Sequence, residues 1–182
     1  MERLEDLSDA ALIERSLRQP RCFEAVFDRH FMSVLRYLRG RVGDDLADDL
    51  AGDVFERAYA GRERYVASSG SALPWLLGIA TNVIRMSARS ERRRIAALGR
   101  LARERVSAGE LPDAPDPRIV SAIAALSPEH RDVLLLHCLA DLTHQQIAIA
   151  LDLAPGTARS YLSRARAALA ASLAPAPIEE VR

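Results

Sequence analysis

Lysine is absent from the chain of 182 residues, so all 25 basic side chains are arginines. They balance 25 acidic side chains, and the formal net charge of +0 argues neither for nor against a nucleic-acid partner. Arginine offers a rigid fork of donors suited to phosphate and guanine, although a GC-rich genome would also explain the missing lysine. The position of the arginines is therefore more informative than their number.

Cysteine is almost as scarce. Cys22 and Cys138 lack CxxC partners, which excludes a disulfide framework and a zinc or redox motif of the usual kind. We expect Cys138 to be a buried core residue, with a thiol switch beside His137 as the alternative. No apolar run is long enough to span a bilayer, and the acidic residues 1–12 do not read as a signal peptide. We expect a cytoplasmic protein without metal or cofactor.

Aromatic residues make up only 5% of the chain, so its core must consist mainly of Leu, Ala, Val and Ile, which favours packed helices over a sandwich. No strand pattern or internal repeat is present. We predict an all-α fold of two small helical domains joined by a flexible, acidic, Pro-rich linker. The expected boundaries are 1–96 for the first domain, 97–117 for the linker, 118–173 for the second domain and 174–182 for a tail.

The second domain carries the pattern of a helix-turn-helix. Ser127 and Pro128 begin one helix, and Thr143 followed by Gln146 forms a capping box for the next. A turn then leads to the last helix, with Thr157 as its expected cap. On that helix small and apolar residues share one face, and the opposite face presents Thr157, Arg159, Ser160, Ser163 and Arg164.

Arg and Ser on an exposed helix after a tight turn are what a reader of the DNA major groove needs. The alternative is a plain helical hairpin with a solvated, charged face. From spacing alone, DNA binding is the favoured interpretation.

In the first domain, the helix predicted over residues 44–61 is strongly acidic. Asp45, Asp49 and Asp53 recur every four residues, a spacing at which like charges destabilise a helix. A basic protein partner would explain them, and a solvated surface is the alternative. Metal binding is a third option, but the segment lacks the loop and glycine of a calcium site.

The helix that follows Pro74 is basic instead. Asn82, Arg85, Arg89 and Arg92 recur at steps of three and four residues, beside a Ser-rich loop at residues 65–71. A stripe of this kind suits a nucleic-acid backbone, and the loop could receive an unstacked base. The residues expected to face the core are Trp75, Ile79, Val83 and Met86.

Two stretches together resemble the extracytoplasmic-function (group 4) sigma factors of the sigma-70 superfamily. The first runs from Asp48-Asp49-Leu50 to Tyr59 and continues with Pro74-Trp75 through Asn82 into Arg85. The second runs from Leu126-Ser127-Pro128 through Thr143 and Pro155-Gly156-Thr157 to Arg166. The resemblance covers nearly everything from about Leu7 to Leu173.

The resemblance implies a promoter-recognition subunit that binds core RNA polymerase through its largest-subunit clamp and its flap. The implied clamp contacts are Asp49, Leu50, Asp53 and Phe55. The implied −10 contacts are Ser69, Asn82, Arg85 and Arg89. The implied −35 contacts are Thr157, Arg159, Ser160, Ser163 and Arg164. An anti-sigma factor is the usual restraint in this family, and no catalytic residue, membrane insertion or small-molecule substrate is implied.

Four residues depart from the family pattern. Gly52 stands where Gln is usual, and Tyr161 replaces a common Arg. His144 and Gln145 stand where Tyr and Glu are frequent. Two other functions remain open. A stand-alone helix-turn-helix regulator would leave the acidic helix and the Arg-Asn stripe without a role, and a helical adaptor would not need Arg159 or Arg164.

Overall fold

The computed structural model describes residues 3–67, 70–98 and 116–174. Within these ranges the chain is helical and contains no strand, which confirms the predicted all-α fold. The helices are α1 (Asp9–Ser16), α2 (Cys22–Val42), α3 (Asp44–Gly61), α4 (Leu73–Leu98), α5 (Pro117–Ala125), α6 (Pro128–Ala140), α7 (His144–Leu151) and α8 (Pro155–Leu173).

Helices α1 to α4 form an N-terminal unit around a shared apolar core. α2 packs against α1, α3 and α4, and α3 packs against α4. Ser8 precedes α1, where the sequence predicts a helix cap, and its side-chain oxygen accepts the N–H of Ala11 at 3.3 Å. The sequence places Gly40 and Gly43 at the end of α2, and the helix stops at Gly43, whose φ of 81° is the left-handed conformation that favours glycine.

The predicted inward face of α4 is partly wrong. Val83 is buried as expected, but Met86 is 50% exposed and Trp75 and Ile79 are only half-buried. The reason is that α4 is covered by α2 and α3 on one side and by α7 on another. Its buried arc is therefore wider than one stripe and consists of Leu76, Leu77, Ala80, Thr81, Val83 and Ile84.

Helices α5 to α8 form a C-terminal unit in which α8 packs against α5, α6 and α7. The capping box before α7 is confirmed: Thr143 accepts the N–H of Gln146 at 3.3 Å, and the Gln146 side chain accepts the N–H of Thr143 at 2.9 Å. Asp141 and Asp152 close α6 and α7 with φ of 52° and 53°. These two turns set the directions of the following helices.

Two expectations in this unit are wrong. Thr157 does not cap α8, because Pro155 takes the first helical position, the cap residue is Ala154 and the N–H of Thr157 donates to its carbonyl at 2.9 Å. Cys138 is exposed rather than buried, because Val133, Leu134 and Leu136 supply the buried face of α6.

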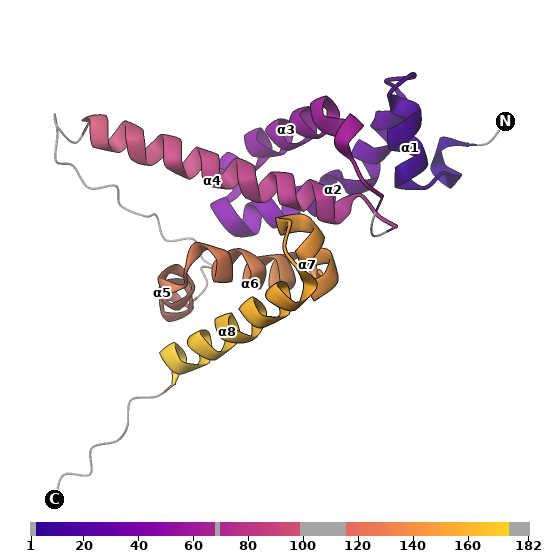
Figure 1. Cartoon of the computed structure of the whole chain (residues 1–182). Helices are drawn as coiled ribbons and strands as arrows, with labels where there is room; N and C mark the ends of the chain where they lie inside the picture. Colours follow the sequence, from indigo (N-terminus) through magenta and orange to yellow (C-terminus); the bar gives the residue numbers. More distant parts are fainter. Residues whose placement is uncertain (1–2, 68–69, 99–115, 175–182) are drawn as a thin grey trace, which may run out of the picture.

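The two units pack directly against each other. α7 lies on α4, and α6 lies on α2 (Figure 1). Most of the expected linker, at 99–115, and the tail residues 175–182 lie outside the described residues. α4 continues to Leu98 and α5 begins at Pro117, so both ends of the expected 97–117 linker are helical. The domain boundaries themselves stay predictions.

Candidate nucleic-acid and protein interfaces

The acidic face of α3 is only partly neutralised. Arg39 of α2 pairs with Asp44 at 3.2 Å and with Asp48 at 3.6 Å. Asp45, Asp49 and Asp53 are exposed, and no ion pair reaches them within the described part of the chain. The stripe that the sequence singled out is therefore a row of uncompensated negative charge.

The other two residues expected to contact polymerase lie differently. Leu50 and Phe55 are buried in the core, where they hold α3 against its neighbours. The sequence spacing puts Leu46 on one apolar stripe with Leu50, Val54 and Ala58, but Leu46 is 51% exposed. Since Leu46, Asp49 and Asp53 are separated by three and four residues, they share one face of α3. Leu46 is thus an exposed apolar side chain beside the acidic stripe, and its exposure was not predicted from the sequence.

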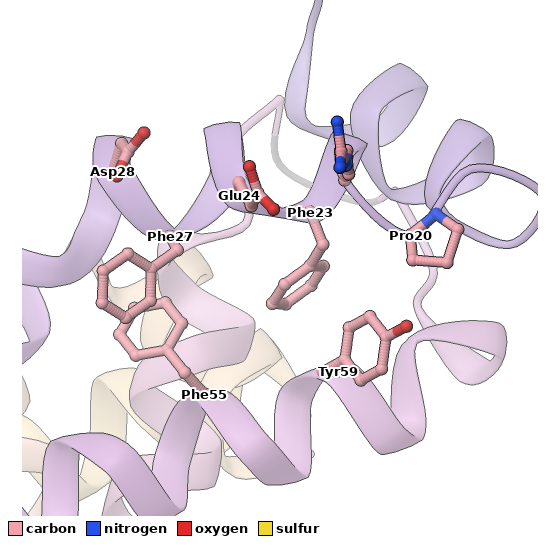
Figure 2. Close-up of a pocket in the computed structure, with 8 residues that line it drawn as sticks. Pro20, Phe23, Glu24, Phe27, Asp28, Phe55 and Tyr59 are labelled. Atoms are coloured by element: carbon pink, nitrogen blue, oxygen red, sulfur yellow. The ribbon is translucent and has the colours of Figure 1, made fainter.

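All four phenylalanines of the chain lie on α2 and α3, and Figure 2 shows three of them, Phe23, Phe27 and Phe55. Phe27 stacks on Phe31 at a centroid distance of 4.8 Å and meets the edge of Phe55 at 4.7 Å. Phe23 meets Tyr59 edge-on at 5.4 Å. The rings of Phe23, Phe27, Phe55 and Tyr59 line an open groove of about 520 Å³. Phe55 therefore belongs both to the α2–α3 packing and to the floor of this groove.

The predicted −10 residues on α4 have different surroundings. Asn82 and Arg89 are exposed. Arg85 is engaged with the C-terminal unit, where its Nε donates to Oδ2 of Asp132 at 2.8 Å. Ser69 lies outside the described residues. The loop side of α4 is closed by Trp75, whose ring lies 5.0 Å from that of Tyr65 and is half-buried between core and surface.

A buried carboxylate fixes the start of α4. Oδ2 of Asp9 accepts the N–H of Ala72 at 2.6 Å and contacts Nε2 of His30 at 2.6 Å, while Oδ1 accepts from Arg29 at 2.5 Å. Burial alone would raise the pKa of Asp9, but the hydrogen bonds from His30 and Ala72 hold that pKa well below its ordinary range. Sequence reasoning missed Asp9, since a charged residue in the first turn of a helix looks like an ordinary cap partner.

The outward face of α8 holds the predicted −35 residues. Ala158, Leu162 and Ala165 are buried, as predicted, so the opposite side of the helix is turned outward. That side presents Thr157, Arg159, Ser160, Ser163 and Arg164, of which Arg159, Ser163 and Arg164 are exposed and Thr157 and Ser160 half-buried.

Histidines hold two of the α8 arginines. Arg159 contacts Nε2 of His144 at 3.2 Å, across the turn of the helix-turn-helix. Arg166 contacts Nε2 of His137 at 2.6 Å. The other nitrogen of His137 lies 2.9 Å from the carbonyl of Leu142, which can only accept, so Nδ1 donates and Nε2 accepts. The His residues therefore orient the basic face of α8.

The described residues contain no group of three His, Cys, Asp or Glu side chains that could hold a metal ion. In that same part of the chain, no helix is long and apolar enough to cross a membrane.

The two units match two family models. Residues 26–94 match the model for sigma-70 region 2, and residues 117–169 match the model for sigma-70 region 4. The chain is 30% identical over 142 residues to the RNA polymerase sigma factor CarQ of Myxococcus xanthus, covering 75% of this chain and 80% of CarQ. It is 31% identical over 160 residues to the ECF RNA polymerase sigma factor SigC of Mycobacterium tuberculosis, covering 85% of each.

The chain therefore belongs to the sigma-70 family, in its extracytoplasmic-function group of RNA polymerase sigma factors. It is a promoter-directing initiation factor. A stand-alone helix-turn-helix regulator is the weaker interpretation, because the match to region 2 accounts for α2, α3 and most of α4.

Solved structures share the fold. RpoE of Bartonella quintana, in complex with the anti-sigma factor NepR, superposes with a TM-score of 0.62 at 21% identity over 84% of this chain and 97% of RpoE. CnrH, in complex with the cytosolic domain of CnrY, gives a TM-score of 0.62 at 21% identity over 91% of this chain and 96% of CnrH. The arrangement of helices is thus that of sigma factors.

Proposed function

We propose that this sigma factor docks on core polymerase through the exposed side of α3, where Asp49 and Asp53 face a basic partner surface. The observation that carries this assignment is the row Asp45, Asp49 and Asp53, which has no ion pair among the described residues. Unpaired like charges at four-residue spacing cost helix stability, and a basic partner would recover that cost. Leu46 adds an apolar contact, while Leu50 and Phe55 support the face from beneath.

Promoter DNA meets two other surfaces in this proposal. Asn82, Arg85 and Arg89 of α4, together with Ser69 in the preceding loop, hold the melted −10 strand. Thr157, Arg159, Ser160, Ser163 and Arg164 of α8 enter the −35 major groove. Arginine can bind guanine with two hydrogen bonds, and the hydroxyl groups can anchor phosphates.

The remaining assignments follow from this mechanism. Residues 1–96 act as the polymerase-binding and −10 domain, residues 118–173 as the −35 domain, and residues 97–117 as the acidic connection through the polymerase. The protein performs no chemistry of its own and works in the cytoplasm, where it meets polymerase. Since RpoE and CnrH were solved with NepR and CnrY, we propose that an anti-sigma factor restrains this protein as well.

The test is co-elution of the purified protein with bacterial core RNA polymerase on a sizing column. We expect stoichiometric co-elution for the wild type and its loss in the double variant Asp49→Arg/Asp53→Arg, with the helical circular dichroism spectrum unchanged. The matched control is Asp6→Arg/Glu14→Arg, which makes the same change of charge at exposed positions before and on α1. Equal binding by the two double variants would refute the assignment of α3.

A further inference from the structure

We propose that Arg41 and Arg85 form one phosphate-binding site for the promoter strand, and that Asp132 fills this site while the two units are packed together. The proposal rests on the proposed −10 role of Arg85. It adds Arg41, which neither the sequence nor the comparisons single out, and it gives Asp132 the role of an internal competitor of DNA.

Both guanidinium groups converge on the same carboxylate. Arg41 Nη2 lies 2.8 Å from Oδ1 of Asp132, and Arg85 lies 2.8 Å from Oδ2 through Nε and 2.5 Å through Nη2. The Asp132 side chain is only 3% exposed, and that of Arg41 is 8% exposed. Two guanidinium groups face one carboxylate and each binds a different oxygen of it. The pair of arginines therefore suits an anion with several oxygen atoms. Paired guanidinium groups bind phosphate in this way.

The N-terminal unit alone positions Arg41. The carbonyl of Leu77 can only accept, so the Thr81 hydroxyl donates to it at 2.9 Å. The Tyr37 hydroxyl must then donate to Thr81 at 3.0 Å, which leaves its oxygen to accept from Arg41 at 3.0 Å. Tyr37 and Thr81 are fully buried. Because this hydrogen-bond chain lies within α2 and α4, the guanidinium group stays in place when Asp132 leaves.

The surroundings extend the site into a basic track. A cleft of about 290 Å³ lies between the units, and Arg41, Arg85, Arg89 and Arg92 line it from the N-terminal side. Arg89 and Arg92 are exposed, and no hydrogen bond or ion pair occupies them within the described part of the chain. Successive arginines at helical spacing can follow the phosphates of one strand.

The packing of α7 on α4 blocks this track. Helix α4 approaches α7 so closely that a Cβ added to Gly78 would lie 2.2 Å from the carbonyl oxygen of Ala150. Asn82, one turn further along α4, faces a cavity of about 240 Å³ whose other walls include Ala150, Asp152 and Tyr161. In the packed state Asp132 holds the guanidinium group of Arg85, although that side chain is 39% exposed, and α7 narrows the approach to Asn82. Binding of the strand therefore requires the units to separate.

The test uses two variants that separate the units for different reasons. Asp132→Ala removes the carboxylate and leaves buried Arg41 without its counter-charge, whereas Gly78→Ala keeps every charge and forces α4 away from the Ala150 carbonyl. The two readouts are the radius of gyration from small-angle X-ray scattering and the fluorescence anisotropy of a labelled, single-stranded 12-mer of mixed sequence. We expect both variants to expand and to bind the oligonucleotide about tenfold more tightly than the wild type does.

The controls distinguish an effect of the proposed phosphate site from a general effect of charge and from a general effect on stability. Glu129→Gln removes the same charge in the same cleft, and Gly52→Ala adds the same methyl group where nothing lies within 4 Å; both should stay compact with unchanged affinity. Arg41→Gln added to Asp132→Ala should abolish the gain. Expansion without tighter binding, or a gain that survives Arg41→Gln, would overturn the phosphate site. Binding to core polymerase, measured in parallel, tests the proposed function separately, since α3 is unchanged in Asp132→Ala and Gly78→Ala.

Discussion

The N–H of Ala72 donates to the carboxylate of Asp9 at 2.6 Å, which joins residues separated by 63 positions. Asp9 lies in the first turn of α1, and Ala72 immediately precedes α4. The contact holds the end of the Ser-rich loop against α1. The position of the residues proposed to bind the melted strand thus depends on α1. In the proposed function, α1 itself contacts neither DNA nor polymerase.

Asp9 predicts a specific dependence of stability on pH. Its pKa is lower in the folded protein than its ordinary value of 3.8, so the folded state favours the charged form. This contribution is complete above about pH 5 and is lost as the pH falls towards the lower folded value. Asp9→Asn should lower the free energy of unfolding by about 3 kcal/mol at pH 7. Between pH 7 and pH 3 the variant should lose less stability than the wild type loses. Urea unfolding at both pH values measures this.

The control for this prediction is Asp28→Asn, because Asp28 is exposed on α2 and has no hydrogen bond or ion pair within the described residues. It should reproduce the wild-type dependence on pH. An Asp9→Asn variant that lost as much stability in acid as the wild type would show that other groups control the acid transition.

Arg159 provides a test of promoter reading. Arg159→Ala should weaken binding at the −35 element by about 1–3 kcal/mol if the guanidinium group contacts a base. The measurement is holoenzyme binding to a promoter that it transcribes and to the same promoter with a scrambled −35 element. Equal losses on the two templates would mean that Arg159 contacts phosphate alone. Arg164→Ala, on the same exposed face, is the matched comparison.

Replacement of Gly52 by alanine should stabilise the protein. It lies inside α3, and a Cβ at this position would meet nothing within 4 Å. Gly52→Ala should therefore raise the free energy of unfolding by about 1 kcal/mol. Gly43→Ala is the contrasting variant, because its φ of 81° strains any side chain and its stability should fall. Thermal unfolding of the two variants, followed by circular dichroism, distinguishes a helix effect from a general effect of added methyl groups.

Local signals in the sequence predicted much of the fold. Two predicted helix caps are confirmed, the Thr143 and Gln146 capping box and the Ser8 cap. A helix cap depends only on residues within one turn, so it can be predicted from local sequence. Thr157 failed as a cap because Pro155, two residues earlier, already starts the helix. Of the two glycines that the sequence offers near the end of α2, Gly43 ends the helix and Gly40 lies within its last turn.

Contacts between the units could not be predicted in the same way. Asp132 precedes a run of apolar residues and looks like the polar side of α6, and Gly78 looks like a weak point in α4. Their partners lie 91 positions away at Arg41 and 72 positions away at Ala150. Nothing local to either residue encodes such a pairing. A glycine inside a helix, such as Gly78, is, however, a signal that another backbone approaches closely there.

The two cysteines differ in a way that makes the molecule convenient to label. Cys22 is buried and Cys138 is exposed, so a maleimide dye should attach at a single natural position on α6. The next residue, Leu139, packs within 2.9 Å of the place a Cβ would take on Gly40 of α2. A fluorophore at Cys138 would sit at the seam between the units and would change its brightness or lifetime as they part. The natural sequence therefore already contains a single attachment site for a dye that would report the proposed separation of the two units.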